Sequence, residues 1–441
     1  MIIFYTQQIT PRLQYIVKTV FDILGVAFFQ ITTDIDVYKA ADSYKINYSQ
    51  ASIIKDEIFI KPHSLLFEND IRKQNISCFI SRGLKAFFKT EGTLPFDIFA
   101  ASFFLISRYE EYLPHALDTY GRYAHTNSIA YKEGFLKLPL INLWLLEFEE
   151  ILLKYFTGLQ LEKMQFQFTP TYDIDIAYSY KGKGLKRNAA ATFKELVAFK
   201  WKALYDRFAV VVNNRRDPFD TYDWLDVMHK QYNLHPIYFF LLAEKVKGYD
   251  RNLSPHTKEM QQLVLHVKQQ GYELGIHPSW QSGDDKMLLQ RELRILESMC
   301  EQAIDKSRQH YLRMHLPATY SRLLQHKIVH DYSMGYGSIN GFRASVTNAF
   351  KWYDVKEDKA TELTVHPFCF MDANAFFEQG FTAAEAAEEL QQFYDAVKMV
   401  NGEMITIFHN HFITTQQQWK DWRSMYESYL QQNFCKDEER E

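Results

Sequence analysis

The sequence predicts an α/β protein of two units, residues 1–160 and residues 165–430. A length of 441 residues suggests two or three domains, and a hydrophobic content of 47% is enough for large cores. From residue 165 to about residue 415, strand patterns alternate with amphipathic helix patterns. Such alternation indicates a parallel sheet with crossover helices, either an open doubly wound sheet or a barrel.

The first unit is expected to begin with a strand, IIFY, followed by a helix from Pro11 to Leu24. Short strands are expected at 52–54 and 57–60, and a helix at 143–156. Within 94–123, helical periodicity places one apolar group on a single side. That group is Phe96, Phe99, Phe103, Phe104 and Ile106. The polar end of the same segment carries Arg108, Glu110 and Glu111.

The second unit is built from predicted strands and helices that follow one another in turn. The strands are expected at 165–175, 236–243, 271–278, 311–315, 335–339 and 403–409. The helices are expected at 221–232, 256–270, 284–303, 318–331 and 383–400. Because open sheets and barrels place their chemistry at the carboxyl ends of the strands, polar residues should gather there.

Composition narrows the classes of partner and compartment. The net charge of −4 gives no case for nucleic acid or an anionic membrane as a general partner, and the basic run 181–187 is interpreted as a solvated loop. The four cysteines form no CxxC pair, which fits a reducing compartment. We expect no signal peptide, no transmembrane segment and a cytoplasmic location, because no run reaches the roughly 18 apolar residues of a membrane span.

Two carboxylates, Asp173 and Asp175, end the first strand of the second unit. Residues i and i+2 of a strand share a face, so the two like charges repel unless a cation is present. A divalent metal resolves this, with one carboxylate as a ligand and the other as general base on an activated water. His277 follows the third strand, at a position where a metal ligand is as plausible as a structural histidine.

Further polar residues follow the later strands. Arg313 and His315 share a face of the fourth predicted strand, and an arginine there can orient a carboxylate. His409 and His411 follow the last strand, and the loop between these strands carries Asp331 and Arg343. Charged or metal-ligating groups thus recur at one end of most predicted strands, which core packing alone does not explain.

The motifs of this unit resemble the polysaccharide deacetylase family, that is, carbohydrate esterase family 4 with its NodB homology domain. The matching stretches are TYDID (171–175), PIYFFL (236–241), GYELGIH (271–277) and ITIFH (405–409). The resemblance implies an irregular (β/α) barrel and a metal-dependent N-deacetylase. It implies that Asp173 is the general base, that Asp175 and His277 are metal ligands, and that His409 is the general acid.

The same resemblance assigns the remaining residues. Arg313 would orient the base, and Asp331 would hold the acid or the arginine. Tyr172, Pro278, Trp280 and Arg343 would contact substrate. The family's second metal-binding histidine falls on Gln281, an amide that is a weak zinc ligand. Either another group such as His315 or His411 completes the site, or the metal has been lost.

The expected function is therefore hydrolysis of an acetamide on a glycan or glycan precursor, with a divalent metal, zinc by resemblance, as cofactor. The alternatives are a carbohydrate-binding or scaffolding protein of surface-polysaccharide assembly, and a different metal-assisted hydrolase on the same barrel. Residues 1–160 resemble an uncharacterised domain found fused to deacetylase-like regions, and the resemblance assigns them no activity.

Overall fold

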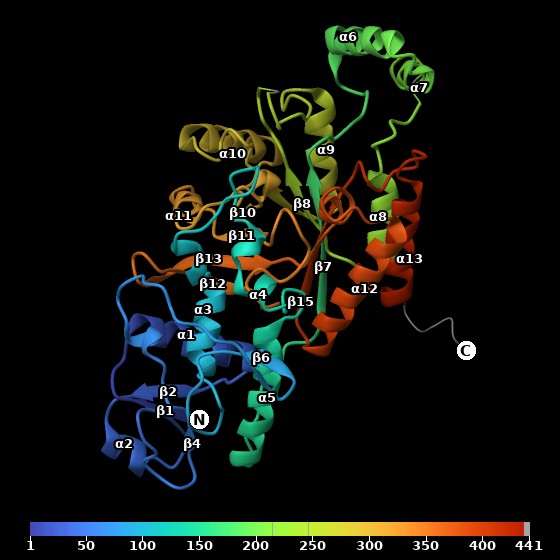
Figure 1. Ribbon diagram of the computed structural model, residues 1–441. Coiled ribbons are helices and arrows are strands. Elements are labelled where there is room, and N and C mark those ends of the chain that lie inside the picture. Colours follow the sequence, from blue (N-terminus) through green and yellow to red (C-terminus); the bar gives the residue numbers. More distant parts are fainter. Residues whose placement is uncertain (214, 246, 436–441) are drawn as a thin grey trace, which may run out of the picture.

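The computed structural model describes residues 1–213, 215–245 and 247–435. It shows an α/β protein in which a small parallel sheet precedes a larger, curled mixed sheet, so the predicted fold class is confirmed (Figure 1). The small sheet and its helices lie at the lower left of the view, and the larger sheet lies above them. In the part of the chain that is described, no helix has both the length and the apolar character needed to cross a membrane.

The small sheet has the strand order β2-β1-β3-β4, and all its pairs are parallel. The strands are β1 (Ile2–Thr6), β2 (Phe29–Thr32), β3 (Tyr44–Tyr48) and β4 (Ile58–Phe59). The expected strand at 52–54 is absent from this described segment. There the backbone N–H of Ile53 and the hydroxyl of Ser52 bond the carboxylate of Glu57 instead of a neighbouring strand.

Helices and a hairpin complete the N-terminal unit. They are α1 (Pro11–Leu24), α2 (Ile35–Ala40), α3 (Ile98–Ile106), α4 (Ile129–Lys132) and α5 (Leu140–Tyr155), with a hairpin of β5 (Phe79–Ser81) and β6 (Leu84–Ala86). Helix α1 has the bounds that the sequence predicted, because Thr10 caps the N–H of Leu13 and Gly25 ends the helix in the left-handed region. Helix α3 is buried on every side and not only on the predicted one.

The large sheet has the order β12-β13-β11-β10-β9-β8-β7-β15-β14, and only the β12–β13 pair is antiparallel. Its strands are β7 (Gln167–Ile174), β8 (Ile237–Phe240), β9 (Glu273–Ile276), β10 (Lys306–Ser307), β11 (His330–Met334), β12 (Phe350–Asp354), β13 (Lys359–Pro367), β14 (Phe370–Met371) and β15 (Glu403–His409). Strand β15 has the predicted bounds. The predicted strand at 335–339 is wrong, since β11 ends at Met334.

The helices of this unit are α6 (Gly184–Val197), α7 (Trp201–Val211), α8 (Tyr222–Gln231), α9 (Lys258–Gln269), α10 (Lys286–Cys300), α11 (Ala318–Gln325), α12 (Ala383–Met399) and α13 (Lys420–Phe434). The predicted strand at 311–315 is also wrong. The strand there is β10, five residues earlier, and His310–Leu312 form a 3₁₀ turn. This shift changes which side chains reach the end of the sheet.

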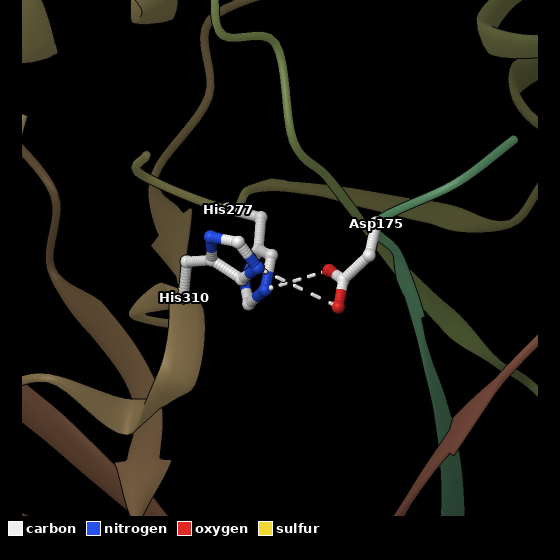
Figure 2. A group of neighbouring side chains, drawn as sticks. All are labelled: Asp175, His277 and His310. Carbon is white, nitrogen blue, oxygen red and sulfur yellow. Dashed lines mark ion pairs between the residues drawn. The ribbon is translucent and has the colours of Figure 1, made fainter. Parts of the chain in front are cut away.

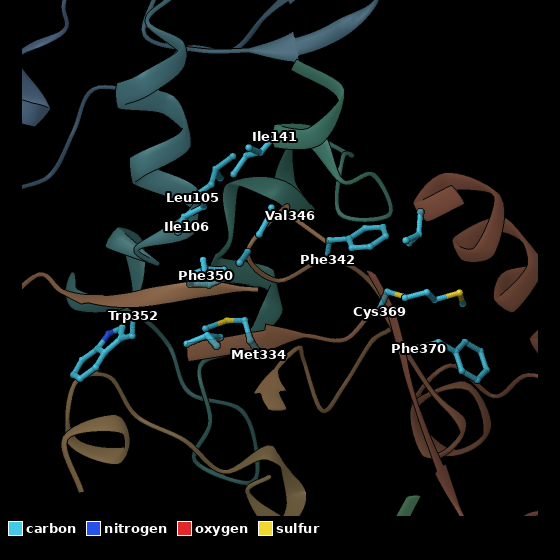
Figure 3. Packing of buried hydrophobic residues seen from close by; sticks show 14 of the residues in the cluster. Leu105, Ile106, Ile141, Met334, Phe342, Val346, Phe350, Trp352, Cys369 and Phe370 are labelled. Carbon is cyan, nitrogen blue, oxygen red and sulfur yellow. The ribbon is translucent and has the colours of Figure 1, made fainter. Parts of the chain in front are cut away.

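The two units share one hydrophobic core. Figure 3 shows Leu105 and Ile106 of α3 and Ile141 of α5 near Phe350 of β12 and Val346 of the preceding loop. All of these side chains are buried. The N-terminal unit is therefore packed directly against the large sheet.

A buried ion cluster joins the same units. The carboxylate of Glu111 accepts two hydrogen bonds from Arg343, at 2.9 and 2.6 Å, and one from Arg108 at 2.7 Å. Arg108 also donates to the hydroxyl of Tyr336 and to the carbonyl of Arg343. The prediction that Arg343 contacts substrate is therefore wrong, because its guanidinium is 3% exposed and bound to the N-terminal unit.

Candidate metal centre

Three side chains that could hold a metal ion meet at one edge of the large sheet: Asp175, His277 and His310 (Figure 2). The Oδ1 atom of Asp175 lies 3.1 Å from Nε2 of His277, and its Oδ2 atom lies 3.6 Å from Nε2 of His310. The ligand atoms all lie within 4.8 Å of one another. Both histidines are buried, and Asp175 is partly exposed.

Sheet topology brings the three residues together. Asp175 follows β7, His277 follows β9, and His310 opens the 3₁₀ turn after β10. These strands lie in the parallel order β10-β9-β8-β7, so their carboxyl ends meet at the same edge. The edge is where parallel sheets ordinarily carry their sites.

Hydrogen bonds fix which ring nitrogen of each histidine faces the aspartate. The Nδ1 atom of His277 bonds the backbone carbonyl of Arg308 at 2.5 Å, and Nδ1 of His310 bonds Oδ1 of Asp250 at 2.9 Å. Since these oxygens accept, each Nδ1 carries the proton. In the neutral rings the Nε2 lone pairs then face the carboxylate of Asp175.

Lone pairs that face a carboxylate repel it unless a proton or a cation lies between them. The Oδ1 atom of Asp175 is buried and has no hydrogen-bond partner. The separations of 3.1 and 3.6 Å are close to the roughly 3.3 Å between ligand atoms at about 2.0–2.1 Å around a tetrahedral zinc ion. The donor set therefore fits a divalent cation.

The pKa shifts reflect the same concentration of charge. Burial alone would raise the pKa of Asp175, but His310, His277 and His409 hold it well below its usual range. Burial alone would lower the pKa of His310, but the carboxylates of Asp175 and Asp250 raise it to about 9. The cluster thus attracts positive charge, which a bound cation would supply in place of protons.

Asp173 lies beside this group and is held by an arginine. Its Oδ1 atom accepts a hydrogen bond of 2.9 Å from Arg308, and its Oδ2 atom lies 3.8 Å from Nε2 of His277. The prediction assigned this arginine to Arg313. That assignment is wrong, because Arg313 lies beyond β10, pairs with Asp284 and stacks on Trp280.

His409 closes the other side of the group. The register of β15 on β7 pairs His409 with Asp173, and Nε2 of His409 lies 3.5 Å from Oδ2 of Asp175. Its Nδ1 atom bonds Oδ1 of Asp372 at 2.6 Å, and its backbone N–H donates to Oδ2 of the same carboxylate. Burial alone would lower the pKa of His409, but Asp372, Asp175 and Asp173 raise it to about 10.

The prediction that Asp331 holds the general acid or the arginine is wrong. Its buried carboxylate accepts hydrogen bonds from the hydroxyls of Ser307 and Ser333 and from the backbone N–H of Ser333. These bonds tie the end of β10 to β11, so Asp331 stabilises the strand pair. The residue that holds His409 is instead Asp372, which follows β14.

Gln281 is not one of the groups that surround Asp175. Its amide nitrogen donates to Oδ2 of Asp250 at 3.0 Å and to the carbonyl of Lys245. Asp250 in turn bonds His310. Gln281 therefore supports Asp250, the carboxylate that orients His310. The third candidate ligand, beside Asp175 and His277, is His310. Neither His315 nor His411 belongs to the group.

Of the predicted substrate contacts, Tyr172 and Pro278 are buried, whereas Trp280 is partly exposed. Strand alternation points Tyr172 away from Asp173, and its hydroxyl bonds His229 and Tyr426 in the core, so its predicted contact is wrong.

Trp280 belongs to an aromatic cluster beside the metal group. Its ring lies 4.4 Å from that of Tyr249 and 5.7 Å from that of Tyr311, which follows His310. Tyr120 of the N-terminal unit reaches the same rings, at 5.3 Å from Tyr311. Amphipathic rings of this kind suit the apolar faces of sugars.

A second group of possible ligands, Asp223, Asp226 and His266, lies on α8 and α9. Nε2 of His266 bonds Asp226 at 2.8 Å, and Asp223 is exposed. This partly buried pair satisfies itself without an ion and carries no site.

Residues 2–157 match the model of one protein family, described as a family of unknown function (DUF7033). No curated protein shows a significant sequence match to the chain.

Among solved structures, the chain is similar to two proteins described as polysaccharide deacetylases, from Mycobacterium smegmatis and Pseudomonas aeruginosa. Each is 12% identical, with TM-scores of 0.39 and 0.40, over 62% of this chain and 87% and 86% of theirs. A family 4 carbohydrate esterase pseudoenzyme from Bacillus anthracis is 10% identical over 62% of this chain and 63% of its own, with a TM-score of 0.28. At such TM-scores any functional argument rests on the site residues themselves.

Proposed function

We propose that residues 165–430 form a metal-dependent hydrolase that removes the acetyl group from an N-acetylated sugar. The observation that carries this proposal is that the Nε2 atoms of His277 and His310 both face the carboxylate of Asp175, while each Nδ1 atom is bonded to an acceptor behind it. Such a set of two imidazoles and one carboxylate leaves a position open for water or substrate on zinc.

The residues on either side of this set support the proposal. When bound, a divalent cation would polarise the acetamide carbonyl and lower the pKa of a water molecule. Asp173, fixed by Arg308, would take the proton of the attacking water. His409, fixed and kept protonated by Asp372, would give a proton to the leaving amine.

The hydrogen bonds behind the ligands support the same proposal. Asp250 orients His310, the Arg308 carbonyl orients His277, and Gln281 supports Asp250. Partners of this kind fix the tautomer and direction of metal-binding histidines. A barrel that had kept only saccharide binding would have no need for this arrangement.

The first test is metal content together with acetate release from N-acetylglucosamine oligomers. The purified full-length chain should hold close to one divalent ion and release acetate, and a chelator should stop the release. Asp173→Asn keeps the shape of the side chain and leaves the metal group intact, so metal content should persist while kcat falls about 10²–10⁴-fold.

Saccharide binding that survives both the chelator and Asp173→Asn, with no acetate released by the wild-type chain, would contradict hydrolysis. It would instead identify the carbohydrate-binding protein that the sequence left as an alternative. Release of other acyl groups, with acetamides untouched, would point to a different hydrolase on the same site.

The aromatic cluster gives a separate prediction about substrate binding. Trp280→Ala should raise KM about 3- to 10-fold, because a stacked ring contributes about 0.5–1.5 kcal/mol. The value of kcat should change little, since Trp280 lies outside the metal group. Steady-state kinetics on N-acetylglucosamine oligomers of increasing length would measure both constants. An unchanged KM at every length would remove Trp280 from the substrate contacts.

A further inference from the structure

Helices α6 and α7, which follow β7 and precede α8 in the chain, form a hairpin that projects from the large sheet (Figure 1). Its base is fixed, because the buried carboxylate of Asp217 accepts the backbone N–H groups of Ser179, Tyr180 and Lys181. The hairpin therefore continues from the strand that carries Asp173, at the carboxyl edge of the sheet.

The hairpin exposes an unusual amount of apolar surface. Nine large apolar side chains within residues 193–212 are exposed: Phe193, Leu196, Val197, Phe199, Trp201, Tyr205, Phe208, Val211 and Val212. A helix on a protein surface ordinarily turns such side chains toward the core. Large contiguous apolar patches mark sites of interaction.

Helix α7 shows that this exposure is directional. Trp201, Tyr205, Phe208 and Val212 follow one another at helical spacing and are 62%, 66%, 57% and 61% exposed. The opposite face buries Arg207, which is bound to Glu195 of α6. The helix thus buries Arg207 and turns an apolar stripe, formed by Trp201, Tyr205, Phe208 and Val212, outward.

The same segment is strongly basic. Residues 181–216 contain ten Lys or Arg and two Asp or Glu, a net charge of +8 in a chain whose total is −4. The lysines at 194, 200 and 202 are exposed beside the apolar side chains. The weak overall charge, which gave no case for an anionic membrane, therefore conceals a local excess of positive charge.

We propose that the α6–α7 hairpin binds the protein to the surface of an anionic lipid membrane. Apolar and aromatic side chains with lysines beside them are the signature of helices that lie in the membrane interface. Neither helix can span a bilayer, so the binding is interfacial. A second copy of the chain fits less well, because a symmetric contact would bring two segments of charge +8 together.

This inference goes beyond the proposed hydrolysis and does not depend on it. It has a consequence for the site, since the hairpin and the metal group lie at the same edge of the sheet. A hairpin bound to lipid would hold that edge near the membrane, where a lipid-linked saccharide would reach it.

The test is flotation of the full chain with vesicles of phosphatidylcholine alone or mixed with phosphatidylglycerol. The wild-type chain should bind the mixed vesicles, more weakly as salt increases. Phe208→Ser should weaken this binding about tenfold. The matched control is Phe28→Ser, which removes a ring outside the hairpin that is at least as exposed as that of Phe208 and should change nothing.

A second variant tests the charge. Lys200→Gln with Lys202→Gln should weaken binding about fivefold for each lysine removed. Absence of binding to mixed vesicles, or equal effects of Phe208→Ser and Phe28→Ser, would overturn the proposal. Sedimentation without lipid provides a further check. A wild-type dimer that Phe208→Ser dissociates would show that the apolar face of α7 binds a second copy of the chain and not a membrane.

Discussion

His310→Ala is expected to abolish stoichiometric metal binding and, with it, any hydrolysis. The substitution removes one of the two imidazoles that face Asp175 and leaves Asp250 without its bonded histidine. Loss of an outer partner typically costs 10–100-fold in metal affinity, so loss of a ligand should cost more than about 100-fold. Elemental analysis after dialysis and a competitive zinc titration would measure the loss.

Gln281→Ala is the matched control, because it changes the residue at which the motif places a ligand. Gln281 hydrogen-bonds Asp250 and the Lys245 carbonyl and lies outside the metal group, so this variant should keep its metal, with affinity reduced about 100-fold at most. Metal retained by His310→Ala but lost by Gln281→Ala would reverse the assignment of the third ligand. Circular dichroism of both variants would show that the fold is intact.

The sequence predicted much of this site because long apolar strands have clear ends. Strands β7 and β15 are regular and buried, so the sequence alone places Asp173, Asp175 and His409 at their carboxyl ends. His277 follows β9 in the same way. The alternation of strands and helices also predicted the parallel sheet that brings these ends together.

Arg308 and His310 were missed because β10 has only two residues, Lys306 and Ser307. Periodicity carries little information in so short a strand, and the apolar pattern of the next residues suggested a strand there. Arg308 and His310 follow β10 directly. Their spacing of two residues was the signal in the sequence that could have placed them at the end of a strand. Tyr311 adopts a positive φ of 57°, a turn that alternation does not predict.

The contact between the two units was likewise invisible in the sequence. Glu111 and Arg343 are 232 residues apart, and each alone resembles an ordinary charged residue in a loop. Arg343 was assigned to substrate contact by the family resemblance alone. Only the packing of α3 and α5 on the large sheet shows that both charges are buried together (Figure 3).

Glu111→Ala is expected to lower the free energy of unfolding by about 3–5 kcal/mol, because it leaves the buried guanidinium of Arg343 without a counter-ion. Arg108 retains Glu110, so the loss falls mainly on the contact between the units. Equilibrium unfolding in urea would measure it. Glu133→Ala is the control, since the Lys85–Glu133 pair, with side chains 35% and 36% exposed, should contribute less than about 1 kcal/mol.

The stabilisation by Glu111 should also depend on pH. Burial would raise the pKa of this carboxyl, but Arg343 and Arg108 lower it to about 2, from an ordinary value of 4.5. Because the pKa is lowered in the folded state, the contribution is complete above about pH 4.5 and is lost as the pH falls toward 2. The stability difference between wild type and Glu111→Ala should therefore shrink across this window. A difference that stays constant from pH 6 to pH 3 would show that Glu111 acts through packing and not through its charge.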